Sequence, residues 1–240
     1  MEVSSHYDIG NDFYRLWLDE TMNYSCGYFK TDKDTLYEAQ VNKTDYILKK
    51  LALEKGMDLL DVGCGYGRTL NELQQMGFCR LSGIDFSEKM IQRGREQFPG
   101  LDLQVMKEGK INRSDQSVDA VILFAVLTCI HRDAGQRELI REIERVLRQE
   151  GILYVNDFLL NEDERNQARY AEYASRYGTY GVFELPEGAV LRHHEETWIF
   201  ELLAGFSPLQ YERLQFTTMN GHISNGFYMI GRKKAENSHV

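Results

Sequence analysis

The alternation of apolar and polar residues predicts strands and helices that follow one another through the middle of the chain. Five short apolar runs have the length of buried strands: 57–62, 81–84, 101–106, 117–124 and 152–155. Between these runs, apolar residues recur every three or four positions, which is the spacing of one helix face. The clearest example is the segment 134–148. Strands that alternate with helices favour an α/β fold with a parallel sheet.

Segments on either side of this core extend the prediction to most of the chain. Helical patterns at 6–18 and 32–53 precede the first strand, and two further strands are predicted at 209–217 and 226–232. We therefore predict a single Rossmann-like α/β domain with helices on both faces of the sheet. The sheet should be seven-stranded and mostly parallel, with an antiparallel last strand.

The first predicted strand ends in a glycine-rich turn at residues 61–68, DVGCGYGR, and a helical pattern follows. A strand, a glycine turn and a helix begin a nucleotide-binding α/β unit. A dinucleotide fingerprint would place its third glycine at position 68, where this chain has an arginine. That bulky side chain fits poorly where a pyrophosphate needs bare backbone. S-adenosylmethionine, a sulfonium cation without phosphate, fits better, because Asp61 and Asp85 supply carboxylates nearby.

At this point the chain resembles the class I S-adenosylmethionine-dependent methyltransferases, whose first motif reads (D/E)-x-G-x-G-x-G. Asp61, Gly63, Gly65 and Gly67 match the motif, and Asp85 follows Gly67 by 18 residues at the end of the next strand. The resemblance implies that Asp85 binds the ribose and that Asp61 and the glycines lie at the methionine end. The further cofactor contacts that we expect are Cys64, Phe86, Met90, Glu108, Gly109 and Phe124. For Glu108, a solvated loop charge is an equal alternative.

The residues before this core resemble a narrower family. Residues 6–29 contain H-Y-D-(x)2-N-D-F-Y followed by L-D-x-T-x-x-Y-S-C-G-Y-F. This pattern is similar to the amino-terminal segment of cyclopropane-fatty-acid synthases and mycolic acid methyltransferases, and the similarity extends to about Gly77. It implies that the segment folds over the cofactor, that Tyr24 and Ser25 touch its methionine part, and that Cys26 helps hold a bicarbonate ion. An ordinary amphipathic helix that covers the sheet is compatible with residues 6–18.

The loops after the fourth and fifth predicted strands carry candidate catalytic residues. Open α/β sheets bind ligands at the carboxyl ends of their strands, which places His131 and Asp157 near the expected methyl acceptor. A histidine has the pKa range of a general base, although His131 can also serve only to hold its loop. Asp157 can likewise face the acceptor or cap nearby backbone amides. With Tyr24, these two residues are the catalytic candidates.

Two features distinguish the chain from a cyclopropane synthase. That family carries a glutamate in the loop after the fourth strand, where it supports the bicarbonate. Here no carboxylate occurs between Asp119 and Asp133, and Thr128 occupies the place. The segment after the fifth strand is short and polar, whereas an acyl substrate needs a long apolar channel. We therefore expect methyl transfer to an O, N or C atom of a small molecule. A cyclopropane-type lipid enzyme and a non-catalytic cofactor-binding module are the alternatives.

Tyrosines and histidines mark the region after the fifth strand. Tyr170, Tyr173, Tyr177 and Tyr180 share one face of a predicted helix, which can either form part of an acceptor cage or pack against the domain. His193 and His194 are adjacent, so on a strand they point to opposite faces and cannot easily share a metal ion. We expect one to face the acceptor pocket and the other to be exposed. No metal site is predicted.

Composition limits the remaining classes. The formal net charge of -9 argues against non-specific binding to nucleic acid. The four cysteines form no CxxC pair, which favours reduced thiols and a cytoplasmic protein. No signal-peptide pattern is visible at residues 1–14, and no apolar run approaches 18 residues.

The expected parts of the domain follow from these assignments. They are a helical lid (1–55), a cofactor-binding core (56–158), a helical insertion over the acceptor site (159–188), and a final helix with the antiparallel strand pair (189–232). The identity of the acceptor and the oligomeric state stay open.

Overall fold

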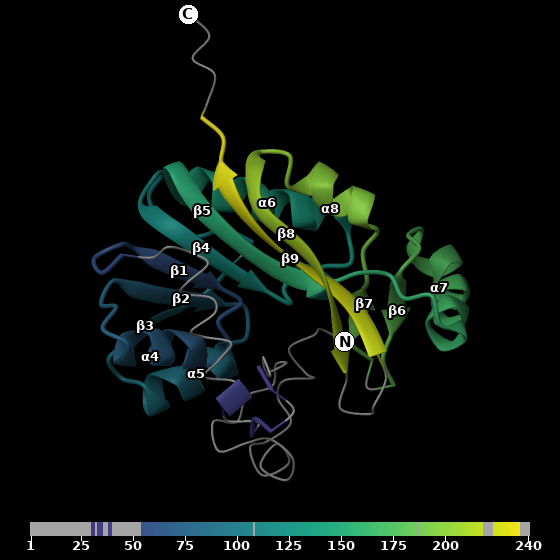
Figure 1. Cartoon of the computed structure of the whole chain (residues 1–240), viewed down its shortest axis with the longest axis horizontal. Coiled ribbons are helices and arrows are strands. Elements are labelled where there is room, and N and C mark those ends of the chain that lie inside the picture. Colours follow the sequence, from purple (N-terminus) through teal and green to yellow (C-terminus); the bar gives the residue numbers. More distant parts are fainter. Residues whose placement is uncertain are drawn as a thin grey trace, which may run out of the picture.

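The computed structural model describes residues 30–31, 33–35, 38–39, 54–107, 109–186, 188–217 and 223–235. Seven strands form its main sheet: β1 (Leu59–Val62), β2 (Leu81–Asp85), β3 (Asp102–Val105), β4 (Val118–Phe124), β5 (Leu147–Phe158), β8 (Phe206–Thr217) and β9 (Ile223–Lys233). Their order across the sheet is β3-β2-β1-β4-β5-β9-β8 (Figure 1). The predicted strand count and the α/β class are confirmed.

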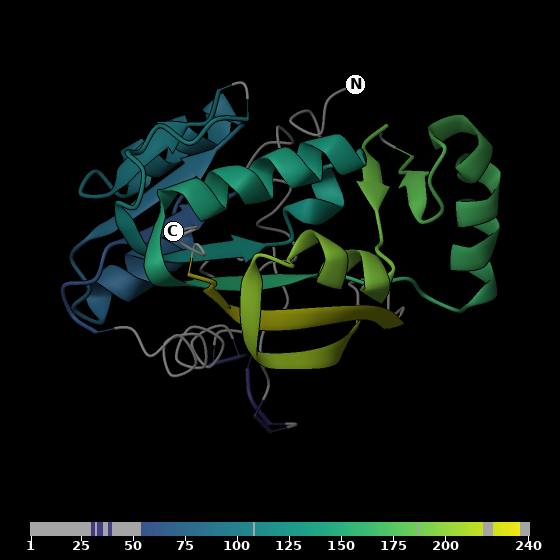
Figure 2. The same cartoon turned by 90° about the horizontal axis from the view of Figure 1, so that it is seen from above.

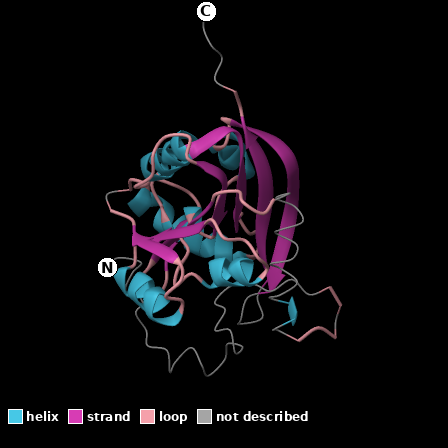
Figure 3. Cartoon of the chain, turned by 90° about the vertical axis from the view of Figure 1, so that its left-hand side faces the viewer, coloured by secondary structure: helices cyan, strands magenta, loops and turns pink. Residues whose placement is uncertain are grey.

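The last strand runs antiparallel, as predicted. Strands β1 to β5 pair in parallel, whereas β9 is antiparallel to both β5 and β8. It therefore lies inside the sheet, and β8 forms the edge. Figure 3 shows the strand that leads to the C-terminus among the long, curved strands.

Helices cover both faces of this sheet. α4 (Arg68–Gln75) and α5 (Glu88–Gln97) pack on one face, and α6 (Asp133–Val146) and α8 (Glu196–Leu202) pack on the other. The insertion after β5 carries α7 (Glu164–Tyr177), and the loop after β4 contains a short 3-10 helix, η1 (Leu127–Cys129). Alternate residues of β4 divide between two apolar clusters, as the period of a strand requires. Val121 and Leu123 pack in the cluster that contains α6 and α8, whereas Ala120 and Ile122 pack with α4 and α5. None of the described helices is long and apolar enough to cross a membrane.

Local sequence determines where these helices begin and end. Ser87 caps α5, as its position after β2 predicts, because its hydroxyl accepts a hydrogen bond from the backbone N–H of Met90 at 3.3 Å. Asp163 caps α7 in the same way through the N–H of Asn166. Gly178 ends α7 with a φ of 68°, a left-handed conformation that glycine adopts without a steric penalty. Tyr180 therefore lies beyond the helix on which it was predicted.

The insertion after β5 contains more than the predicted helix. After α7, the short strands β6 (Val182–Glu184) and β7 (Val190–Arg192) pair antiparallel in a separate two-stranded sheet. This hairpin was not predicted, and it extends the insertion past residue 188. Figure 2 shows α7, β6 and β7 together at one end of the molecule, on the side away from α4 and α5. The predicted lid helices at 6–18 and 32–53 fall almost entirely outside the described residues.

Candidate functional site

The glycine turn between β1 and α4 has a left-handed backbone that glycine adopts without strain and that other residues rarely adopt. Gly63, Gly65 and Gly67 have φ angles of 79°, 56° and 85°. The N–H of Gly63 donates to the carbonyl oxygen of Ile84 at 2.8 Å, which ties the turn to β2. A Cβ on Gly63 would lie 2.3 Å from Val126 Cγ2, whereas a Cβ on Gly65 would have no described atom within 4 Å. The turn is thus closed at Gly63 and open at Gly65.

Two carboxylates stand beside this turn. Asp85, at the end of β2, accepts hydrogen bonds from the N–H of Gly65 and the N–H of Ser87, each at 2.8 Å. Burial raises the pKa of Asp85, and these backbone donors oppose the rise. Asp61, in β1, is also buried, with 5% of its surface exposed. The turn therefore has a local negative charge, which suits a cation and opposes a pyrophosphate.

The thiol of Cys64 lies within the same turn. Burial raises its pKa first, and the negative charges of Asp61 and Asp85 raise it further. Its Sγ would be 2.7 Å from a Cβ placed on Gly83, so the side chain packs against β2. Cys64 is consequently a neutral packing group that can contribute its backbone to a ligand, and it has no nucleophilic character.

Other predicted cofactor contacts surround the turn. Phe86 follows β2 with 41% of its surface exposed, and Met90 lies half-buried in the first turn of α5. Phe124, at the end of β4, packs edge-on against Tyr154 with ring centroids 4.9 Å apart. Gly109 has a φ of 69° in a tight turn after β3. Glu108, Tyr24, Ser25 and Cys26 lie outside the described residues, so their roles stay predictions.

Asp157 lies beneath the loop that follows β4. Its side chain is fully buried, and its carboxylate accepts hydrogen bonds from the N–H groups of Phe158 (2.8 Å) and Thr128 (3.2 Å). Burial raises the pKa of Asp157 to about 7, and the backbone donors, which include Leu127 and Val126, oppose that rise. This geometry supports the alternative in which Asp157 caps amides, and it gives no support to direct contact with an acceptor.

His131 ends the same loop and is half-buried. Its imidazole lies edge-on to Tyr177 of α7, with ring centroids 5.5 Å apart. Burial lowers the pKa of His131, and the positive charges of Arg132 and Arg192 lower it further. A neutral imidazole at pH 7 has the protonation state that a general base requires.

The expectation for His193 and His194 is wrong, because both side chains are buried and neither is exposed. His193 Nδ1 lies 2.6 Å from the hydroxyl of Tyr170, and the His194 ring lies between Phe158 O (3.0 Å) and Gln136 Nε2 (2.8 Å). Burial lowers the pKa of His193 to about 3 and that of His194 to about 4. Both are neutral structural groups.

The predicted tyrosine face has one tyrosine that packs in the core and two that can line an acceptor site. Tyr170 is fully buried and packs against Phe183 and His193, so it serves the core of the insertion. Tyr173 and Tyr177 are half-buried with ring centroids 6.4 Å apart, and the ring of Tyr177 contacts His131. These two tyrosines are thus the part of the face that can line an acceptor site.

A buried arginine joins the insertion to the loop, and the sequence analysis did not identify it. Arg192 of β7 is 5% exposed, lies 2.5 Å from Asp133 and donates to the carbonyl oxygen of His131 at 3.2 Å. A charged residue in a three-residue strand gives no periodic signal. The sequence showed only that Arg192 directly precedes the two histidines, which does not indicate its burial.

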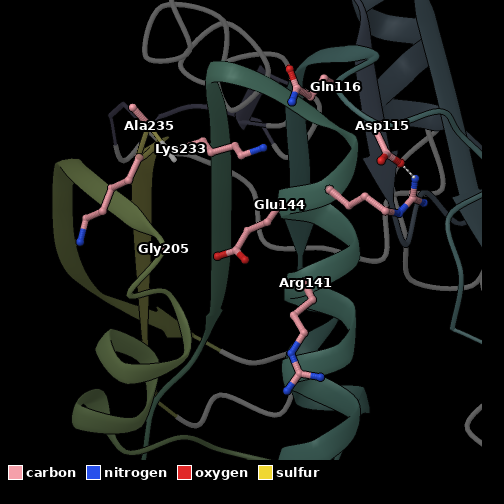
Figure 4. Close-up of a pocket in the computed structure, with 9 residues that line it drawn as sticks. Asp115, Gln116, Arg141, Glu144, Gly205, Lys233 and Ala235 are labelled. Atoms are coloured by element: carbon pink, nitrogen blue, oxygen red, sulfur yellow. Dashed lines mark hydrogen bonds and ion pairs between the residues drawn. The ribbon is translucent and has the colours of Figure 1, made fainter. Parts of the chain in front are cut away.

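A separate groove lies at the opposite edge of the sheet. It has a volume of about 490 Å³ between the end of α6 and the ends of β8 and β9 (Figure 4). Glu144 points into it, and Arg145 pairs with Asp115 at 2.7 Å beside it. It is remote from the glycine turn, because α6 ends where the parallel strands begin. In the described part of the chain, no three His, Cys, Asp or Glu side chains are grouped as metal ligands would be.

Comparison with solved structures defines the class to which the fold belongs. A SAM-dependent methyltransferase from Methanosarcina mazei superposes with a TM-score of 0.72 at 24% identity, covering 79% of this chain and 98% of that one. A cyclopropane synthase from Mycobacterium tuberculosis superposes with a TM-score of 0.73 at 20% identity, covering 95% and 96%. A mycolic acid cyclopropane synthase complexed with SAH and CTAB gives 0.73 at 21%, covering 96% and 97%. The fold is the Rossmann-like fold of these methyltransferases.

The chain belongs to the mycolic acid cyclopropane synthetase family, whose model matches residues 1–214. It is 40% identical over 124 residues to cyclopropane mycolic acid synthase 3 of Mycobacterium tuberculosis, a match that covers 50% of this chain and 43% of that protein. It is 57% identical over 86 residues to cyclopropane mycolic acid synthase 1 of the same species, covering 36% and 30%. These matches span less than half of each relative. The predicted family is confirmed, but the limit at Gly77 was too narrow.

Proposed function

We propose that this chain is an S-adenosylmethionine-dependent methyltransferase that acts on an O, N or C atom of a small molecule. The observation that carries the proposal is the turn at 63–67, which is open at Gly65 and has two buried carboxylates beside it. A Cβ at Gly65 would occupy space that no described atom fills, and the local charge suits a sulfonium. S-adenosylmethionine, when bound, supplies an electrophilic methyl group.

The residues of the turn would hold that cofactor. Backbone donors fix both carboxylate oxygens of Asp85. The remaining lone pairs can therefore accept hydrogen bonds from the ribose hydroxyls without reorganisation of the side chain. Asp61 and the backbone of Gly63 would face the methionine end, and Phe86 and Met90 would flank the base. Tyr24 and Ser25 would close over it, as the family resemblance implies.

On the acceptor side, alignment and proton removal are the two requirements. His131 is the candidate base, since its depressed pKa keeps the imidazole neutral at pH 7. Tyr173 and Tyr177 would form the wall that aligns the acceptor beside it. An acceptor that loses a proton during methylation would transfer that proton to the unprotonated imidazole nitrogen of His131.

A cyclopropane-type reaction on lipid is the second candidate, because the family match continues to residue 214. Against it stands the loop after β4, where Thr128 is buried and donates its hydroxyl hydrogen bond to the carbonyl oxygen of Arg192 at 2.9 Å. Residues 120–132 contribute no carboxylate of their own to support a bicarbonate. We further propose a cytoplasmic location, which suits the reduced thiols of Cys64, Cys79 and Cys129.

The test uses S-adenosylmethionine labelled on its methyl group, incubated with the protein and a whole-cell extract. Products are separated into lipid and aqueous phases, and Asp85→Ala protein serves as the control. Label in the aqueous small-molecule fraction, absent with the variant, supports the proposal. Label in lipid, especially if bicarbonate increases it, supports the second candidate instead. Cofactor binding without label in either phase would leave two explanations, a binding module or a substrate that the extract lacks.

A further inference from the structure

The loop from Ala125 to His131 begins in a strained conformation. Ala125 has a φ of 53°, which an L-residue other than glycine rarely adopts. Its N–H donates to the carbonyl oxygen of Asn156 at 2.8 Å, which fixes the residue against β5. Strain of this kind persists only where the surrounding structure enforces it, and it is concentrated at functional sites. Side chains from three other elements hold the rest of the loop.

Asp157 of β5 binds the backbone donors of the loop. Its carboxylate accepts from the N–H of Thr128 at 3.2 Å and also interacts with the N–H groups of Val126 and Leu127. These are the first amides of η1, which have no partner inside so short a helix. Asp157 thus takes the place of a helix cap, but from a neighbouring strand and with no exposure to solvent.

Gln136 of α6 binds the backbone acceptors of the same loop. Its Nε2 lies 3.0 Å from Leu127 O and 2.7 Å from Ile130 O. Its Oε1 accepts from the indole N–H of Trp198 at 2.7 Å, which fixes the orientation of the amide. Gln136 is completely buried, so water does not compete for these bonds.

Arg192 of β7 holds the far end of the loop. Its Nη1 donates to His131 O at 3.2 Å, and its own carbonyl oxygen accepts from Thr128 Oγ1 at 2.9 Å. Asp133 lies 2.5 Å from the guanidinium, and the ring of Trp198 lies 5.0 Å below it. The loop is consequently tied to β5, α6 and β7 by three buried polar side chains.

We propose that Asp157, Gln136 and Arg192 are positioning residues that present His131 to the acceptor and close Val126 onto the cofactor turn. The second link is steric, because Val126 Cγ2 occupies the space beside Gly63. The proposal rests on the function proposed above. It makes this segment a preorganised wall of the acceptor site, fixed before any ligand binds. A loosened loop would lower turnover more than it lowers the affinity for S-adenosylmethionine.

The test compares Asp157→Asn with Asp119→Asn. Asp119 also caps a backbone amide, that of Asp58 at 2.7 Å, but at the opposite edge of the sheet. Hydrogen exchange of the loop amides, calorimetric binding of S-adenosylmethionine and the rate of label transfer to the aqueous fraction are measured. For Asp157→Asn we expect exchange at 126–128 to rise at least tenfold, turnover at saturating cofactor to fall at least tenfold, and the cofactor Kd to change by less than threefold. Asp119→Asn should change none of these.

Two results would overturn the proposal. Unchanged exchange at 126–128 in Asp157→Asn would show that the carboxylate does not hold the loop, and faster exchange with full turnover would show that the loop does not position His131. If Asp157→Asn fails to fold, Thr128→Val, which removes only the hydroxyl bond to Arg192, should give the same pattern with smaller changes. A wild-type protein without turnover would contradict the proposed function, whereas the exchange data would still test the anchoring.

Discussion

At the scale of single residues, the three glycines of the turn have different structural roles. All three glycines of the turn have positive φ angles, but an added Cβ would lie 2.3 Å from Val126 Cγ2 at Gly63 and 3.0 Å from Leu103 Cδ1 at Gly67. Gly65 has open space instead. The structure therefore separates a glycine needed for folding from one needed for a ligand.

This separation predicts opposite phenotypes for two alanine variants. Gly63→Ala should destabilise the free protein strongly, because its Cβ would meet Val126 Cγ2 at 2.3 Å. Gly65→Ala should cost only the left-handed strain, about 1 kcal/mol, but should weaken S-adenosylmethionine binding at least tenfold. Thermal unfolding without ligand and calorimetric titration measure the two effects. A Gly65→Ala protein with wild-type affinity would remove this space from the cofactor site.

Asp85 gives a second prediction at this scale. Asp85→Ala should weaken S-adenosylmethionine binding by about 1.5–3 kcal/mol, the value of a lost charge-assisted hydrogen bond. Asp85→Asn is the closest control, since it keeps an acceptor oxygen for one of the two backbone donors, Gly65 N–H or Ser87 N–H, while it removes the charge and the second acceptor. It should bind with intermediate affinity. Unchanged calorimetric affinity in Asp85→Ala would contradict the ribose assignment.

At the scale of elements, β5 contains a break in its pairing with β4 that was not predicted from the sequence. Val118 of β4 pairs with Leu147, but Ala120 pairs with Ile152, so residues 148–151 lie outside the regular pairing. Glu150, within them, has a φ of 62°. Its contact with Arg232 at 3.6 Å is between exposed side chains and contributes little.

A glycine at position 150 should therefore stabilise the protein. Glu150→Gly removes the left-handed strain of a side chain, whereas Glu150→Ala removes the charge and keeps the strain. We expect the glycine variant to exceed the alanine variant by roughly 1 kcal/mol in unfolding free energy. Denaturant unfolding of the two variants measures this difference. Equal stabilities would mean that the segment relaxes to another backbone conformation.

The elements also differ in how well the sequence alone predicts them. Apolar periodicity predicted the strands and the sheet class, because burial on one or two faces leaves a repeating pattern. The spacing of the glycines after the first strand predicted the turn. It did not give the β6–β7 hairpin, whose strands have three residues each, too few to show a period. The anchoring of the loop at Asp157 was equally hidden, since its bond to Thr128 joins residues 29 positions apart. Gln136 lies only 6 to 9 residues from its loop partners, but a polar residue on a predicted helix gives no sign of which backbone groups it binds. Burial of His193 and His194 followed from the unpredicted hairpin.

At the scale of the whole molecule, the insertion and the core are joined through buried polar groups. The backbone N–H of His194 donates to Phe158 O at 3.1 Å, and the N–H of Leu160 donates to His194 O at 2.9 Å. The His193 ring stacks on Phe158 of β5 and meets Phe183 of β6 edge-on. Protonation of either ring would place a charge inside this junction.

This junction predicts that stability falls in mild acid. Because the pKa of His193 is about 3 in the folded state and near 6.5 when unfolded, the unfolded chain binds the extra proton below pH 6.5. Each histidine shifted in this way costs on the order of 2 kcal/mol between pH 6.5 and pH 5. Asp157, whose pKa is raised to about 7, has the opposite sign, because its contribution is lost as the pH rises from 4 to 7. The loss of stability from His193 and His194 exceeds the gain from Asp157, so the free energy of unfolding falls in acid.

His193→Asn isolates one of these contributions. Asparagine can retain a hydrogen bond to Tyr170 but cannot titrate, so the variant should be less stable than wild type at pH 7.5 and lose less stability by pH 5. The groups whose charges act on His193 are Arg165, Arg169, Asp163 and His194, and all of them remain in the variant. Urea unfolding at half-unit pH steps gives both curves, which should converge by on the order of 2 kcal/mol. Parallel curves would show that His193 has the same pKa in the folded and the unfolded chain, which would contradict its burial as a neutral group.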